Sequence, residues 1–263
     1  MLSTIGLMIL TVWLLMTNGG RTSLAKSPAR RNRMTFVEPF VPLFIWFGGV
    51  ITAVSLTTII FAGLDDYQAA IVNNLWLLVI GIVVIVLIFA LSPKYFARGL
   101  KGMGLNIKTM LRDFLSAFVH LIAIYPLILS SLLLTLFFGQ LLIGPSYQIT
   151  AHQELELLTK YPDIGLRVLI AVIAIVIAPL LEELMFRGLL QTMLRSYLKN
   201  AWISIVLTSV FFSAVHGNVG HWLALFVLAV CLGYSYEKSG SLLRPIFIHA
   251  LFNAINVTGV LLQ

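Results

Sequence analysis

Four polar side chains stand within strongly apolar runs in the second half of the chain. Glu182 lies in APLLEELMFR, His216 ends FFSAVH, and His249 and Asn253 lie in PIFIHALFN. An ionisable side chain inside a transmembrane helix costs at least about 2.5 kcal/mol on insertion scales. We therefore treat these residues as functional candidates, because a carboxylate, two imidazoles and an amide on three separate segments are difficult to explain by packing alone.

The adjacent glutamates Glu182 and Glu183 are expected to have different roles. Neighbouring residues on a helix point about 100° apart, so the two carboxylates face different partners. Glu183 precedes Arg187 by one helical turn, which is the favourable order for an ion pair within a helix. We assign that pair to structural support. Glu182 has no local cation and is a candidate general base, and the alternative is a second structural carboxylate bonded to a neighbouring helix.

The histidines differ in how strongly their positions indicate function. His249 and Asn253 lie one helical turn apart and share a face. A lone intramembrane histidine is more often a packing residue, and His120 is interpreted in that way. Counting about 1.5 Å per residue places His249 about 10 Å and His216 about 22 Å from the starts of their helices on one membrane face. The two histidines meet only if the helices tilt or if the helix of His216 starts later than predicted.

The composition indicates a membrane protein. Of the 263 residues, 60% are hydrophobic and 10% are charged, whereas a soluble domain carries roughly 25% charged residues. Apolar runs long enough to cross a hydrocarbon core of about 30 Å recur along the chain. Helices are the expected spanning form, because unpaired backbone groups are costly in lipid and the sequence lacks the alternation of barrel strands. The fold class is predicted to be all-α, a polytopic transmembrane helical bundle.

We predict about eight membrane helices, with seven as the alternative, since the last segments are short or interrupted by polar residues. The predicted segments are residues 1–18, 39–63, 69–92, 114–143, 164–190, 201–216, 219–236 and 242–262. Basic residues follow the first segment and none precedes it, so a retained anchor is favoured over a cleaved signal peptide. We divide the chain into N-terminal membrane helices with basic loops, 1–113, and a core that carries the candidate residues, 114–263.

The formal net charge of +7 reports orientation and not nucleic-acid binding, because the basic residues lie in the gaps between apolar runs. Residues 21–33 and 94–112 hold five lysines and arginines each. By the positive-inside rule their face is expected to be cytoplasmic. The outer 145–163 connection contains HQELELLTK, interpreted as a surface loop in preference to a short amphipathic helix. The single cysteine, Cys231, provides neither an intrachain disulfide nor a thiol pair for zinc.

Three short motifs are similar to those of the CPBP family (CAAX protease and bacteriocin-processing, or Abi), whose members resemble type II CAAX prenyl endopeptidases. EELMFR at 182–187 resembles the EExxxR motif of the family, FSAVH at 212–216 its FxxxH motif, and HALFN at 249–253 its HxxxN motif. The motifs occur in the family's order on C-terminal apolar segments. The resemblance covers about residues 164–262, and the first three predicted helices add nothing specific to it.

This resemblance implies an intramembrane endopeptidase that hydrolyses a peptide bond of a membrane-associated protein or peptide, prenylated or not. The resemblance implies that Glu182 and His216 activate a water molecule. It implies that His249 and Asn253 stabilise the oxyanion. Glu183 and Arg187 are implied to support the site. The expected partners are membrane lipid and a peptide or protein substrate, without nucleic acid. The expected location is the inner membrane of a bacterial cell.

Two questions stay open at this stage. The first is whether the reaction is glutamate-dependent and metal-free, as we favour, or uses zinc held by Glu182, His216 and His249. The second is whether the chain is an enzyme at all, because a non-catalytic immunity or scaffold protein with the family fold is the alternative. A transporter is disfavoured, since the sequence shows no internal repeat.

Overall fold

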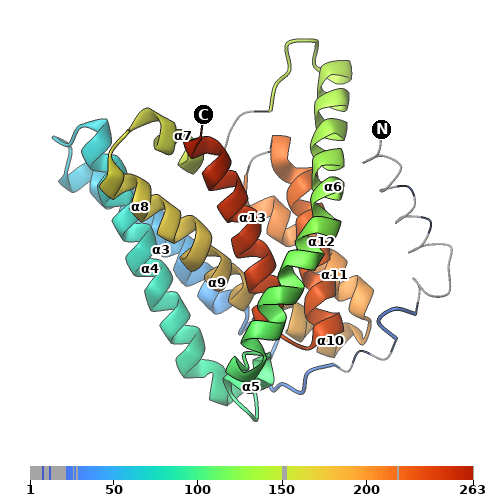
Figure 1. Ribbon diagram of the computed structural model, residues 1–263. Helices are drawn as coiled ribbons and strands as arrows, with labels where there is room; N and C mark the ends of the chain where they lie inside the picture. The colour runs from blue at the N-terminus through green and yellow to red at the C-terminus, as the bar shows by residue number, and fades with distance from the viewer. Residues whose placement is uncertain are drawn as a thin grey trace.

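The computed structural model describes residues 29–149, 153–217 and 219–262, together with residues 8, 12, 22–25 and 27. The predicted first membrane segment, 1–18, lies almost wholly outside these residues. The described part is helical and contains no strand, so the all-α prediction is confirmed (Figure 1). Its α-helices are α3 (Phe40–Ile60), α4 (Asp66–Tyr95), α5 (Leu100–Met103), α6 (Met110–Leu142), α7 (Gln153–Lys160), α8 (Ile164–Val172), α9 (Ala178–Glu183), α10 (Thr192–Leu198), α11 (Ala201–Val215), α12 (Trp222–Ser239) and α13 (Leu243–Leu261).

Several helical segments of the described chain are long and apolar enough to cross a membrane. There are five of them, Phe40–Ile60, Asp66–Tyr95, Ile107–Leu142, Ile164–Leu198 and Val219–Ser239. Helix α13 has 19 residues but carries polar side chains. Helix α11 has 15 residues, which gives a length of about 22 Å, less than a hydrocarbon core of about 30 Å. The chain is therefore an integral membrane protein with a helical bundle.

The segment Ile164–Leu198 is one long helical run whose regular turns are interrupted twice by wider π turns. The first π segment is Ile173–Ile177 and the second is Leu184–Gln191, and α9 lies between them. Pro179 stands at the start of α9 and has no N–H to donate. Such π turns occur frequently at functional sites, and here they flank both adjacent glutamates.

The helices pack so that the candidate residues come from the centre of the bundle. Helix α11 packs against α12, α6 packs against both α12 and α13, and the first π segment packs against α13. Helices α3 and α4 form a pair on the far side of α8 and α9 (Figure 1). The largest buried cluster joins α4, the second π segment, α11 and α12, and Phe212 lies within it with no exposed surface.

The interpretation of HQELELLTK as a loop was wrong, because its residues 153–160 form α7. Leu158 is buried against Leu166 and Ile170 of α8. A helix this short is not stable through helix propensity alone, and the burial of this apolar side chain stabilises it.

The basic and the acidic gaps lie at opposite ends of the bundle. At one end, which we call the basic end, Arg33 donates its backbone N–H to Tyr95 O, and Arg30 stacks 3.5 Å from the centre of the Tyr236 ring. At the other end Lys160 pairs with Asp66. Loops that are distant in sequence therefore share an end, as the charge pattern predicts.

A buried charge cluster fixes the start of α13 to α6. Asp113 has no exposed surface, accepts a hydrogen bond of 2.6 Å from the Ser241 hydroxyl, and pairs with Arg244 at 3.0 Å. The backbone N–H of Leu242 donates to Gly104 O. Gly104 has a φ of +104°, in the left-handed region that favours glycine. This cluster sets the position of α13, on which His249 lies.

The positive-inside rule predicts that the basic end is cytoplasmic. Cysteines introduced as Lys108→Cys and Asp66→Cys, in a Cys231→Ser background, test this because both native side chains are exposed at opposite ends. An impermeant maleimide added to intact cells should label the Asp66→Cys variant and leave the Lys108→Cys variant unlabelled until the cells are opened. The reverse pattern would invert the orientation.

Candidate active site

Two candidate histidines converge on one carboxylate oxygen of Glu182. Glu182 lies near the end of α9, His216 follows the last residue of α11, and His249 lies within α13. Glu182 Oε2 lies 3.7 Å from His216 Nε2 and 3.8 Å from His249 Nε2. The structure therefore brings both histidines to the same level, although straight counting along the helices placed them at different depths.

The distances around Glu182 leave room for a small polar group. They exceed the range of a direct N···O hydrogen bond, about 2.7 to 3.2 Å, and suit a bridge through one water molecule. Glu182 Oε2 is buried and has no hydrogen-bond partner among the described residues. The side chains of Glu182 and His216 are 21% and 19% exposed, so the site is reachable from one side.

The hydrogen bonds of the two histidines assign their protons. His216 Nδ1 lies 2.6 Å from Phe212 O, and His249 Nδ1 lies 3.0 Å from Glu183 Oε1. Both partners are acceptors, so each Nδ1 carries a hydrogen and each neutral imidazole presents an acceptor Nε2. Each Nε2 atom then lies within 3.8 Å of Glu182 Oε2, which is itself an acceptor. Acceptors that face one another require a donor between them, and a water molecule can donate to two of them.

Glu183 and Arg187 form the ion pair predicted from their spacing. Arg187 Nη1 lies 2.5 Å from Glu183 Oε1, and neither side chain is exposed. Arg187 also donates to Ala229 O of α12 at 3.2 Å, and its guanidinium lies 4.7 Å from the Phe212 ring centre. Glu183 also orients His249. This contact could not be predicted from the spacing of residues along one helix. The structural pair therefore also holds one histidine of the site.

Asn253 is held by the first π segment. Its Nδ2 donates to Ala174 O at 2.7 Å. In this π turn the N–H of Ala178 bonds to Ile173 O, so the next carbonyl, Ala174 O, would require the N–H of residue 179. Residue 179 is proline, and the carbonyl is left for a side chain. An oxyanion role for Asn253 therefore depends on its second amide hydrogen, since the first is used here.

His120 lies apart from this group. Its Nδ1 lies 2.6 Å from Ser116 O of its own helix, α6. Nothing in that contact involves the three converging residues, and the interpretation of His120 as a packing residue agrees with it.

The separations around Glu182 are wider than those between the ligands of a bound zinc ion. Within the described ranges, no group of three His, Cys, Asp or Glu side chains has the arrangement of a metal site. Tetrahedral zinc with bonds of about 2.0 to 2.1 Å would bring neighbouring ligand atoms to about 3.3 Å, closer than the separations of 3.7 and 3.8 Å around Glu182. We therefore route no reaction step through a metal.

Replacing Glu183 by glutamine should lower folded yield, because Arg187 and His249 would lose their charged partner. Breaking a buried pair of this kind costs roughly 3 to 5 kcal/mol. Fluorescence size-exclusion chromatography and thermal denaturation in detergent measure the effect. The control is Glu156→Gln on the exposed side of α7, which should behave as wild type. A Glu183→Gln protein of normal yield and melting temperature would remove the structural role of the pair.

Comparisons with known proteins cover the segment that contains these residues. Residues 164–255 match the family described as type II CAAX prenyl endopeptidase Rce1-like. The curated "Uncharacterized 24.3 kDa protein" of Escherichia coli is 29% identical over 115 residues, which are 42% of this chain and 53% of that protein. The match thus covers about half the length of this relative. No solved structure matches the chain. The family match spans every converging side chain, and it confirms the resemblance to CAAX-type proteases for the segment 164–255.

Proposed function

We propose that the chain is an intramembrane endopeptidase that hydrolyses a peptide bond of a membrane-associated protein or peptide. The observation that carries the proposal is the convergence of Glu182 with the Nε2 atoms of His216 and His249. This convergence lies inside an integral membrane bundle and within the segment that matches the CAAX endopeptidase family. A carboxylate facing two oriented imidazoles is suited to hydrolysis, because it can take a proton from a held water molecule.

The reaction begins with a water molecule in the gap beside Glu182. His216 Nε2 accepts one hydrogen of this water and orients it, and Glu182 takes the other proton as the water oxygen bonds to the peptide carbonyl carbon. The carbonyl oxygen becomes an oxyanion. The C–N bond then breaks, the proton held by Glu182 passes to the departing amine, and the other product keeps a carboxyl group.

The oxyanion is assigned to His249 and Asn253, which approach from α13. His249 takes up a proton from solvent at Nε2 before the water attacks and keeps it through the reaction, so its Nε2–H donates to the oxyanion. Glu183, which accepts from Nδ1–H, stabilises this imidazolium. Asn253 supplies its free amide hydrogen. Donors held in a buried site stabilise developing charge more strongly than donors in water. Arg187 offsets the charge of Glu183, so the site does not carry two uncompensated carboxylates.

The second candidate, a non-catalytic immunity or scaffold protein, makes no use of Glu182 Oε2. That atom has no hydrogen-bond partner among the described residues and is buried. A buried carboxylate oxygen without a partner destabilises the fold, which favours a chemical role for it over a purely structural one.

Glu182→Gln should keep folded yield near wild type and lower turnover by at least about 10²-fold, because the amide cannot accept the water proton. The first measurement compares the membrane peptidomes of cells that carry wild type or Glu182→Gln. The second follows cleavage of a farnesylated CAAX peptide and its unprenylated twin by purified protein in nanodiscs, with metal content assayed alongside. Equal peptidomes and equal cleavage by both proteins would favour the scaffold alternative.

Asn253→Ala should lower turnover by about 10² to 10³-fold with little change in KM, the usual effect of removing one oxyanion donor. It should also lower the melting temperature, because Ala174 O loses its partner. Ser131→Ala on α6 is the control, since that buried hydroxyl bonds only to the carbonyl of Leu127 in its own helix. If Asn253→Ala loses stability but keeps turnover, Asn253 only repairs the π turn and the oxyanion assignment is wrong.

A further inference from the structure

A row of polar side chains leads from the candidate active site toward the basic end. It consists of Glu183, Arg187, Gln191 and Arg195, which recur every fourth residue on the helical run of the site. The side chains of Glu183 and Arg187 are 0% exposed, Gln191 is 0% exposed, and the Arg195 side chain is 13% exposed. The row runs from the end of α9 through the second π segment into α10. We call this row the polar seam.

The polar seam is held against the backbone of α12 in matching register. Arg187 donates to Ala229 O and Gln191 donates to Gly233 O, each at 3.2 Å, so one turn of the seam matches one turn of α12. One turn further, Gln191 also donates to Glu237 Oε1 at 3.2 Å. A Cβ atom at Gly233 would lie 2.7 Å from Gln191 Oε1, so the glycine permits the close approach.

Every member of the polar seam leaves one buried polar atom without a hydrogen-bond partner in the described part of the chain. These atoms are Glu183 Oε2, Arg187 Nε, Gln191 Oε1 and Arg195 Nε. Buried polar atoms in folded proteins are nearly always paired, with protein or with ordered water. An ordered water molecule beside each of these atoms supplies the missing partner.

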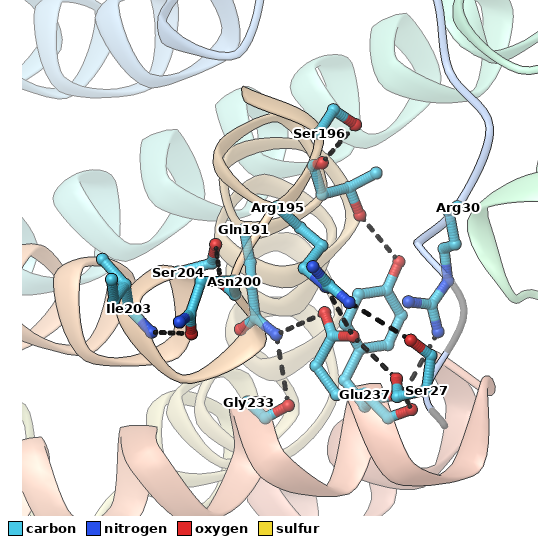
Figure 2. Close-up of polar contacts among 12 residues, drawn as sticks. Ser27, Arg30, Gln191, Arg195, Ser196, Asn200, Ile203, Ser204, Gly233 and Glu237 are labelled. Carbon is cyan, nitrogen blue, oxygen red and sulfur yellow. Dashed lines mark hydrogen bonds and ion pairs between the residues drawn. The ribbon is translucent and has the colours of Figure 1, made fainter. Parts of the chain in front are cut away.

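The Arg195 end of the polar seam lies next to a polar pocket at the basic end. The pocket has a volume of about 520 Å³, and its lining includes Ser27, Arg30, Glu237 and Lys238. Figure 2 shows Gln191 and Arg195 converging on Glu237 from one side, with Ser27 on the other side of the same carboxylate. Glu237 is 3% exposed and therefore stands between the seam and the pocket.

We propose that the polar seam is a water path that connects this pocket to Glu182. Its consequence for catalysis rests on the proposed function, because each hydrolysis consumes one water molecule in a site surrounded by apolar helices. The hydration of the seam itself does not rest on it. The four unpaired atoms of the seam alternate between acceptor and donor along the row. A single file of water molecules can therefore keep a polar partner at each position along the path.

The first experiment measures hydration without activity. Gln191→Cys and Leu190→Cys are made separately in a Cys231→Ser background; Leu190 is the matched control, because it is buried at the same depth on the same helix. Membranes are treated with 2-aminoethyl methanethiosulfonate, which reacts with thiolates and requires water. The Gln191→Cys variant should react at least about tenfold faster, since reactivity follows exposure of the thiolate. Equal rates would overturn the proposal.

The second experiment separates a water path from simple packing by using two replacements of Gln191. Gln191→Leu keeps volume and removes polarity, whereas Gln191→Ser keeps a hydroxyl and leaves room for water. A water path predicts that Gln191→Leu loses about tenfold in turnover at unchanged KM and that Gln191→Ser stays near wild type. A packing role predicts that serine is the worse replacement, because it leaves a cavity. That order would overturn the proposal. If wild type cleaves nothing, the proposed function fails, and the labelling rates still decide whether the seam is hydrated.

Discussion

The fully buried ion pair between Glu183 and Arg187 is the interaction on which the centre of the bundle depends. Two opposite charges without exposed surface are costly to bury, and the cost is offset only when further hydrogen bonds satisfy them. Here those bonds come from other elements, His249 on α13 and the Ala229 carbonyl on α12. One pair therefore joins the helix of the glutamates to two neighbours. The orientation of His249 follows directly from it.

The second constraint is the irregular backbone on either side of α9. Pro179 prevents a regular helix through the apolar run, and the wide turn before it leaves the Ala174 carbonyl to Asn253. A carbonyl without a partner is expensive in a membrane interior, where water does not replace it. The amide of α13 therefore completes the backbone of the helix that carries Glu182. Two elements of the site are in this way built as one unit.

The proposed hydrolysis requires a site that combines a dry surrounding with access to water. The apolar cluster around Phe212 provides the dry surrounding, and the Phe212 ring contacts both the Arg187 guanidinium and the His216 imidazole. Low local polarity strengthens the interactions of the charged groups. We assign the access to water to the polar seam, three of whose members, Arg187, Gln191 and Arg195, contact α12.

The sequence alone determined the features that depend on local spacing and on total hydrophobicity. The all-α class and the pairing of Glu183 with Arg187 are of this kind, because hydrophobic run length and helical period are properties of neighbouring residues. Pro179 could have indicated an irregular turn, but no such prediction was made from it. Only the tertiary structure decided that His216 and His249 meet at Glu182 Oε2, because helix tilt and π turns shift residues along the membrane normal by amounts that no sequence period encodes.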